Sequence, residues 1–352
     1  MNSSLIGVKM KKLISLFTVV FTLLLMLDVA YAGGGNRTGT GGASELLIPV
    51  GPRGIAMGQS NVSTSFGIES LFWNPAGVSK MNNSANVMFS HMSYIADIGV
   101  EYGAVAANFE GFGVLSFSLK ALDVGDILVT TTQNPDGTGD TYSPTMMIAG
   151  LSYSRQLTER IAVGLTANLI SEKLGNVSAS GVAFNVGVIY DDLADINGLS
   201  IGVVMKNIGP QMKYDGSGLY TQATVSGYNR PPQYYKIDAA PYELPSTFEI
   251  GVGYKPQLDE VNTLQFSGNF QNNNFSADEY KFGAEYGYNN LFFLRAGYQF
   301  APNIDSQDYI YGLTAGVGLN YDFEGISLKI DYAFRDVDYF DGNHVFALSL
   351  GF

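Results

Sequence analysis

Large apolar residues alternate with polar or small ones in the stretch Ile326-Ser327-Leu328-Lys329-Ile330-Asp331-Tyr332-Ala333-Phe334-Arg335. A period of two predicts a β-strand with one apolar and one polar face. A slip of one residue would turn Lys329, Asp331 and Arg335 toward the apolar side, and in a bilayer this costs about 2–4 kcal/mol for each mid-depth Lys or Arg. We therefore predict a membrane-spanning strand whose register is fixed by this penalty.

The same alternation recurs in fourteen segments. They lie near residues 85–95, 97–110, 112–122, 143–156, 160–172, 178–191, 198–207, 248–255, 261–271, 278–289, 292–299, 313–321, 326–335 and 342–352. Every second junction is tight, as bacterial barrels keep short turns on the periplasmic side and longer loops outside. The fold class predicted for residues 85–352 is all-β, an antiparallel transmembrane β-barrel of about fourteen strands in the outer membrane of a diderm bacterium.

The last segment has apolar residues at every second position, Phe346, Leu348, Leu350 and Phe352. We interpret this pattern as the membrane-insertion signal of the barrel. It predicts outer-membrane lipid and the outer-membrane barrel-assembly machinery as partners.

The N-terminal sequence is typical of an export signal, which predicts a signal peptide over residues 1–32. Its parts are three lysines, an apolar run and a small-x-small cleavage site, at Lys9, Lys11 and Lys12, Leu13–Leu27 and Ala30-Tyr31-Ala32. Translation from Met1 or from Met10 fits this pattern. The chain has no cysteine, so it offers neither a lipoprotein attachment site nor a disulfide framework.

The composition supports a barrel and disfavours a nucleic-acid partner. The formal net charge is −13, whereas phosphate binding requires a basic surface. Charged residues make up only 14% of the chain, compared with about 25% in soluble domains. Glycine numbers 42, tyrosine 22 and phenylalanine 22, as expected for small lumen residues and aromatic girdles.

Residues 33–84 contain no convincing spanning strand and are the candidate plug, or hatch. They begin with a glycine-rich linker, and a barrel of this size has space in its lumen that something must fill or leave as a pore. Two motifs supply the candidate plug residues, which are Arg53, Met57, Gly58, Trp73, Asn74, Pro75, Ala76 and Gly77. The plug is either purely structural or a latch whose movement opens a passage.

Within these motifs, Asn74-Pro75 predicts a turn with Asn74 in extended geometry, because proline disfavours helical geometry in the residue before it. Trp73 is expected to anchor this turn against the barrel wall. Arg53 is expected to pair with a lumen carboxylate. The sequence leaves four candidates open, Glu101, Glu249, Glu285 and Asp331.

The longest loop, around residues 208–245, is rich in tyrosine and proline. Tyrosine gives rigid contact area at low entropic cost, and proline stiffens the loop. The candidate partner-contact residues are Tyr220, Tyr228, Tyr234, Tyr235 and Tyr242. The alternative is a lid that folds over the barrel mouth and does nothing else.

Catalytic chemistry is not indicated, and we expect no catalytic residue, cofactor or metal. The only histidines, His91 and His344, are expected to be structural neighbours at the seam between the first and last strands. No nucleophile elbow, phosphate loop or zinc-protease motif is present. The acidic stretch Asp336–Asp341 lacks the spacing of a helix-loop-helix calcium site and is interpreted as a solvated loop.

The motifs Gly51-Pro52-Arg53-Gly54-Ile55-Ala56-Met57-Gly58 and Leu71-Phe72-Trp73-Asn74-Pro75-Ala76-Gly77, followed by the barrel, resemble the PorV/PorQ family. This is a branch of the FadL-like outer-membrane proteins, whose N-terminal segment folds into a fourteen-stranded barrel as a hatch. The resemblance implies a non-enzymatic barrel that assists type IX protein secretion or surface attachment of cargo proteins, with exported cargo and other secretion components as partners. The alternative is a FadL-like channel for uptake of hydrophobic molecules.

Overall fold

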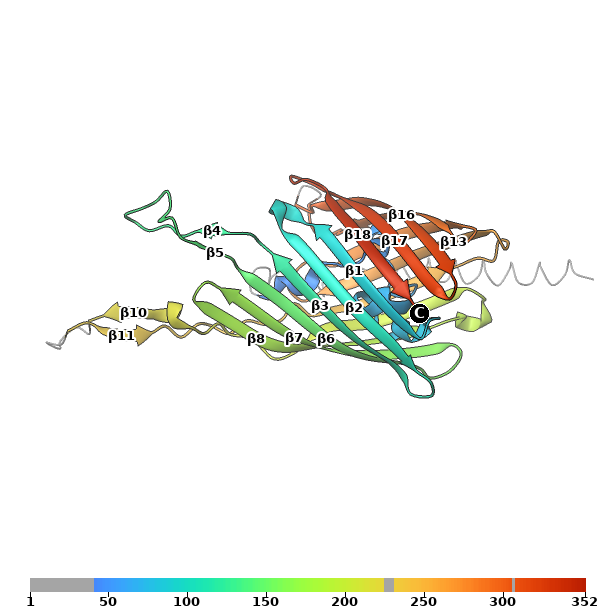
Figure 1. The fold of residues 1–352 in the computed structure, drawn as a ribbon, viewed down its shortest axis with the longest axis horizontal. Helices are drawn as coiled ribbons and strands as arrows, with labels where there is room; N and C mark the ends of the chain where they lie inside the picture. Colours follow the sequence, from blue (N-terminus) through green and yellow to red (C-terminus); the bar gives the residue numbers. More distant parts are fainter. Residues whose placement is uncertain (1–40, 225–230, 306–307) are drawn as a thin grey trace, which may run out of the picture. The chain divides into compact units, whose positions relative to one another are not determined.

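The computed structural model describes residues 41–224, 231–305 and 308–352, and fourteen of its strands form a closed antiparallel barrel (Figure 1). The barrel strands are β1 (Ala85–Ser93), β2 (Gly99–Phe109), β3 (Gly113–Asp123), β6 (Thr145–Gln156), β7 (Ile161–Leu174), β8 (Val177–Tyr190), β9 (Leu199–Ile208), β12 (Thr247–Tyr254), β13 (Asn262–Asn273), β14 (Glu279–Tyr288), β15 (Phe292–Phe300), β16 (Tyr311–Phe323), β17 (Ile326–Val337) and β18 (Asn343–Gly351). Each predicted strand is confirmed to within a few residues. The predicted signal peptide and the linker up to residue 40 lie outside the described residues.

The barrel closes where β1 pairs with β18, with Asn86 opposite Gly351 and Ser93 opposite His344. Every other barrel strand pairs with its nearest barrel strands along the chain. This meander is the topology that short turns alternating with longer loops require, because consecutive antiparallel strands need only a hairpin to connect them.

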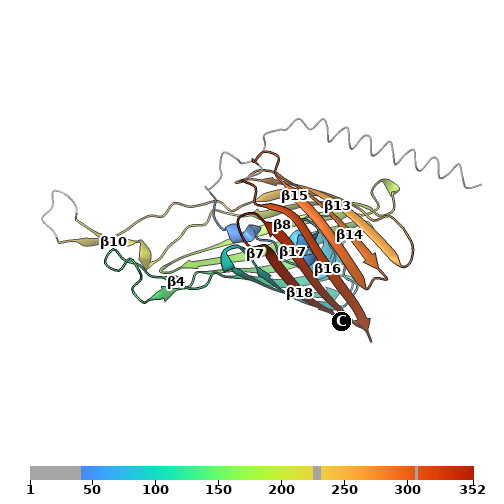
Figure 2. The ribbon, with the colours of Figure 1, turned by 90° about the horizontal axis from the view of Figure 1, so that it is seen from above.

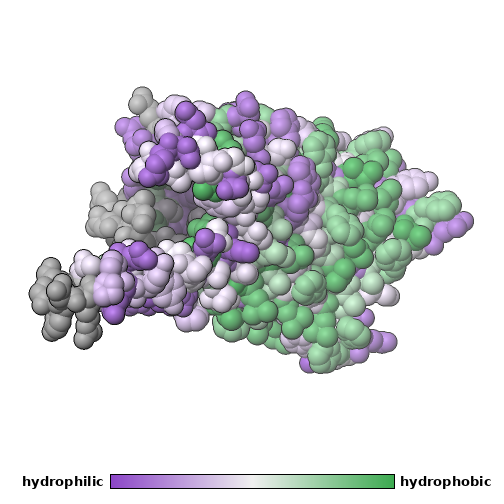
Figure 3. Space-filling view, turned by 60° about the vertical axis from the view of Figure 1, so that its left-hand side comes forward, coloured by the Kyte–Doolittle hydropathy of each residue, from purple (hydrophilic) through white to green (hydrophobic). Residues whose placement is uncertain are grey.

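The two faces of the strands follow the predicted alternation. In β17, Ile326 and Ile330 are exposed on the outer surface, whereas Asp331 and Arg335 are buried inside. The ammonium of Lys329 lies 5.4 Å from the ring of Phe66. The outward side chains form an apolar surface over the strands, while the hairpin end is hydrophilic (Figure 3). The lipid-facing register is therefore the one that keeps these charges out of hydrocarbon.

Residues 41–84 lie within the barrel, and we call them the inserted segment. They form five short helices, η2 (Ser44–Leu47), α2 (Pro52–Ala56), η3 (Gly67–Glu69), α3 (Ser70–Trp73) and η4 (Pro75–Lys80). Helix α2 contacts β15, β16 and β17, whereas η4 contacts β6, β7 and β8 on the other side of the barrel. A segment that touches opposite walls must run through the lumen.

Two hairpins extend the long loops beyond the barrel, and the sequence did not predict them. They are β4 (Ile127–Leu128) with β5 (Thr141–Tyr142), and β10 (Tyr220–Ala223) with β11 (Gln233–Lys236). Figures 1 and 2 show both projecting from the same end of the barrel. Short helices η5 (Ile95–Asp97) and η6 (Leu193–Asp195) lie in other connections, and η7 (Ser217–Leu219) directly precedes β10. The described residues include no helix that is long and apolar enough to cross a membrane.

Candidate functional site

The inserted segment rests directly on glycines of the barrel wall. A Cβ atom added at any of these positions would lie no more than 3.0 Å from an atom of the segment. They come from seven strands and are Gly164, Gly187, Gly202, Gly251, Gly283, Gly297 and Gly316. Contacts this short are rare for real Cβ atoms, so glycine at these positions lets the segment lie directly against the wall. The high glycine content of the chain is therefore partly a property of this contact surface.

The first motif is fixed to the wall by Arg53, which pairs with Glu285, one of the four predicted candidates. The guanidinium donates from Nε to Oε2 at 2.8 Å and from Nη2 to Oε1 at 2.9 Å. Arg295 donates to the same Oε2 at 2.6 Å and to Oδ1 of Asp331 at 2.5 Å. The result is a buried row of alternating charges. Such bidentate, charge-assisted bonds are strong and directional.

Two other candidate carboxylates have different partners. Glu249 lies 2.6 Å from the ammonium of Lys206. The expectation that Glu101 faces the lumen is wrong, since its side chain is exposed on the outer wall and accepts from His91 at 2.5 Å. Val100 and Tyr102 occupy the inward positions of this strand, and the period of two then turns Glu101 outward.

The two histidines do not form the predicted seam contact. His91 is opposite Phe346 in the register, and His344 is opposite Ser93. The ring of His344 instead lies 2.8 Å from the hydroxyl of Tyr332. Each histidine therefore has its own partner on a neighbouring strand.

The first motif ends in a tight turn at Met57 and Gly58. Gly58 has a φ of 61°, and its N–H donates to the hydroxyl of Thr314 at 3.0 Å. This hydroxyl donates in turn to the carbonyl of Ala56 at 2.9 Å. Met57 is fully buried. The N–H of Gly58 also donates to the carbonyl of Ile55 at 3.0 Å, so Thr314 adds a bond from the wall to each of two backbone groups at the end of α2.

The second motif turns at Asn74, which has the predicted extended geometry with φ −153° and ψ 108°. Its amide donates to the carbonyls of Val62 at 3.0 Å and Val188 at 3.2 Å, and its Oδ1 accepts from the N–H of Ala76 at 3.1 Å. Ser154 donates to the carbonyl of Pro75 at 2.6 Å. The fully buried Asn74 therefore joins two parts of the segment to the wall.

Trp73 is buried in the apolar cluster that includes Met88 and Ala104 of the wall, and it also packs within the inserted segment. A Cβ atom at Gly54 would lie 2.3 Å from the indole, so the ring covers helix α2 of the same segment. The ammonium of Lys206 in β9 lies 5.9 Å from the centre of the indole ring. The structure thus brings the candidate residues of both motifs together inside the barrel, where they are buried. A Cβ atom added at Gly77 would lie 2.3 Å from the carbonyl oxygen of Ser65.

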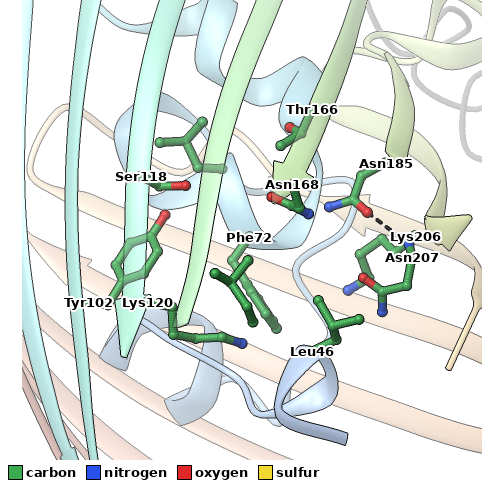
Figure 4. A pocket seen from close by; sticks show the side chains of 12 residues that line it. Leu46, Phe72, Tyr102, Ser118, Lys120, Thr166, Asn168, Asn185, Lys206 and Asn207 are labelled. Carbon is green, nitrogen blue, oxygen red and sulfur yellow. Dashed lines mark hydrogen bonds between the residues drawn. The ribbon is translucent and has the colours of Figure 1, made fainter. Parts of the chain in front are cut away.

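A small polar cavity of about 40 Å³ separates the segment from one part of the wall (Figure 4). Lys120 and Lys206 lie on the ring of Phe72, at 5.0 and 4.9 Å from its centre. Lys120 also donates to the carbonyls of Glu45 and Ile48, at 2.7 and 3.0 Å. Sequence reasoning missed both lysines, although their inward parity in β3 and β9 was a usable signal. The cavity has room for a few water molecules at most.

The tyrosine-rich loop divides into an exposed tip and a packed base. Tyr220 and Tyr234 in the β10–β11 hairpin are 53% and 70% exposed, and Tyr235 is also exposed. Tyr242 is half-buried at the base, where its hydroxyl donates to Glu172 at 2.8 Å. Tyr228 lies outside the described residues. Within the described ranges, no three His, Asp or Glu side chains are arranged to hold a metal ion.

A closed antiparallel barrel with an apolar outer band and a hydrogen-bonded segment in its lumen defines an integral outer-membrane β-barrel protein. The family described as "Type IX secretion system protein PorV" matches residues 32–226, more than half of the sequence. The chain therefore belongs to the PorV family and is an outer-membrane protein of type IX secretion.

Solved structures share the fold at low sequence identity. The CymD monoaromatic hydrocarbon channel has a TM-score of 0.53 and 14% identity, over 87% of this chain and 98% of that one. The toluene transporter TbuX of Ralstonia pickettii has a TM-score of 0.51 and 13% identity, over 86% and 98%. The toluene transporter TodX of Pseudomonas putida has a TM-score of 0.51 and 14% identity, over 86% and 97%. No curated protein matches the chain.

Proposed function

We propose that this barrel binds exported proteins at the cell surface during type IX secretion and passes them to surface attachment, without catalysing a reaction. The match of residues 32–226 to the PorV family carries this proposal. The β10–β11 hairpin supports it, because the hairpin projects from the barrel (Figure 2) and its Tyr220 and Tyr234 are exposed aromatic contact area. Cargo and other secretion components are the proposed partners.

The inserted segment, within residues 33–84, is proposed to be the plug of this barrel. Its contacts with opposite walls and the buried pair of Arg53 with Glu285 support a closed lumen. A plugged barrel suits a receptor that binds protein outside the membrane. Insertion by the barrel-assembly machinery through the final strand, Phe346 to Phe352, stays a prediction.

The rival function is a channel for hydrophobic molecules, which is what the names of the similar solved structures describe for those proteins. A cavity that binds benzene has a volume of about 150 Å³. The cavity of about 40 Å³ beside Phe72 is smaller and is lined by two lysines and three asparagines. This cavity is therefore too small and too polar to be a binding site for an aromatic hydrocarbon.

The test compares a gene deletion with a hairpin variant that carries both Tyr220→Ala and Tyr234→Ala. We expect both strains to lose surface-anchored proteins while uptake of a labelled aromatic hydrocarbon is unchanged. Tyr142→Ala, in the other hairpin, is the matched control and should keep normal secretion. Loss of uptake with normal surface proteins in the deletion strain would overturn the proposal.

A further inference from the structure

The start of the inserted segment meets the base of the tyrosine-rich loop at one junction. Gly42 donates from its N–H to the carbonyl of Glu243 at 3.2 Å, and Met212 and Tyr242 exchange two backbone hydrogen bonds of 2.9 and 2.8 Å. Beneath them, Leu46 of the segment packs in one apolar cluster with Met212 of the loop. This junction precedes Arg53 in the segment and attaches the tyrosine-rich loop to the segment.

Two carboxyl groups are buried at this junction. Glu45 of η2 and Glu172 of β7 are each 2% exposed. The hydroxyls of Tyr214 and Tyr242 both donate to Oε2 of Glu172. Among the described residues, Oε1 of Glu45 and Oε1 of Glu172 have no hydrogen-bond donor. The nearby cation, Lys120, donates to main-chain carbonyls rather than to either carboxylate.

Two ionised carboxylates cannot remain together in such a site. Burial penalises each charge, and like charges at short range repel each other. One proton resolves both problems, because a protonated carboxyl donates a strong hydrogen bond to its ionised neighbour. A shared proton needs only the carboxyl oxygens that it joins, whereas a calcium ion, which could also neutralise two carboxylates, prefers six or more oxygen ligands.

We propose that Glu45 and Glu172 hold one shared proton, and that this proton keeps the inserted segment attached to the base of the tyrosine-rich loop. Its loss leaves two negative charges in the apolar cluster and separates the two elements. The loop then moves independently, while the pair of Arg53 with Glu285 still holds the rest of the segment. This inference does not depend on the identity of any secreted protein.

The pKa values of Glu45, Tyr214 and Tyr242 are all raised, so each of these groups favours its protonated form. Burial, and then the neighbouring Glu172, raise the pKa of Glu45 from 4.5 to about 7, and Lys120 offsets this only in part. Burial and Glu172 also raise the pKa values of Tyr214 and Tyr242, so both hydroxyls stay protonated donors. Since the attached state binds the proton more tightly than the detached state, attachment is strongest at acidic pH and weakens as pH rises toward about 7.

The experiment measures amide hydrogen exchange of the folded, full-length protein in detergent, corrected for the intrinsic pH dependence of exchange. We expect the opening constant at Gly42, Met212 and Tyr242 to rise about tenfold per pH unit between about pH 5 and pH 7, and then to level off. Glu45→Gln, whose amide imitates the protonated carboxyl, should abolish this dependence. The exposed Glu159→Gln should keep it.

Glu172→Gln supplies a second test if the first variant fails to fold. Burial still raises the pKa of Glu45 in this variant, so the rise in the opening constant with pH should shrink without disappearing. In infrared spectra, the wild type at about pH 6 should show a protonated carboxyl band that Glu45→Gln lacks. Exchange that is independent of pH in the wild type would overturn the proposal. So would protection at about pH 8 that calcium restores and a chelator removes.

Discussion

Arg53 and Glu285 join the inserted segment to the barrel wall through two parallel hydrogen bonds, although 232 positions separate them in the sequence. Glu285 is shared with Arg295, its direct cross-strand partner in the register of β14 and β15. The wall residue Glu285 therefore has one cationic partner in the wall, Arg295, and a second in the inserted segment, Arg53.

Arg53→Met is expected to lower the free energy of unfolding by about 3–5 kcal/mol, because it leaves buried charge without its partner. Unfolding in lipid vesicles can be followed by the fluorescence of Trp73, the only tryptophan in the chain. Arg155→Met, at an exposed position, is the control and should change stability little. Equal effects of the two substitutions would contradict the role assigned to the pair.

Gly297→Ala is expected to displace the inserted segment, since the added Cβ would lie 2.1 Å from the N of Gly58. Overpacking of this kind costs about 1–3 kcal/mol. Conductance in planar bilayers should rise as the lumen opens. Gly312→Ala is the matched control, because its nearest neighbour is 3.8 Å away, and it should conduct like the wild type. Unchanged conductance and stability in Gly297→Ala would argue against a seated segment.

Asn74→Asp separates the two functions of this side chain. The aspartate keeps the acceptor for the N–H of Ala76 but loses the donor to Val62 and Val188. The two carbonyls then lack that donor and face a buried carboxyl group, and we expect a loss of at least about 1–3 kcal/mol in the free energy of unfolding. Asn134→Asp, in an exposed loop, should be neutral. Trp73 emission reports both, and wild-type stability of Asn74→Asp would show that the amide contacts contribute nothing.

Leu169→Arg tests which face of β7 meets lipid. Leu169 is 62% exposed near the middle of the strand, so a charge there should cost about 2–4 kcal/mol. Leu157, 58% exposed, lies in the turn before β7, where the same substitution should cost about 0–1 kcal/mol. The comparison is made by reversible unfolding in vesicles. A similar cost at both depths would mean that the outer face is not in hydrocarbon.

Several features of the candidate site were predictable and others were not. The motif residues near Arg53 and Asn74 were identified because their composition breaks the alternation of the barrel. The proposed contact role of Tyr242 was harder to judge, because tyrosine suits an exposed contact and a buried donor equally well. Its attachment to Glu172 depends on where the loop returns to the wall.

The sequence by itself determined the strands, their lipid-facing sides and the barrel, because alternation is local and each slip in register carries the cost of exposing charges such as Lys329 and Arg335 to lipid. Only the tertiary structure decided that Arg53 pairs with Glu285, that Glu101 faces outward, and that Glu45 and Glu172 are buried at the same junction. These pairings depend on how the inserted segment crosses the lumen, and that path is set by contacts between residues far apart in the chain rather than by any local period.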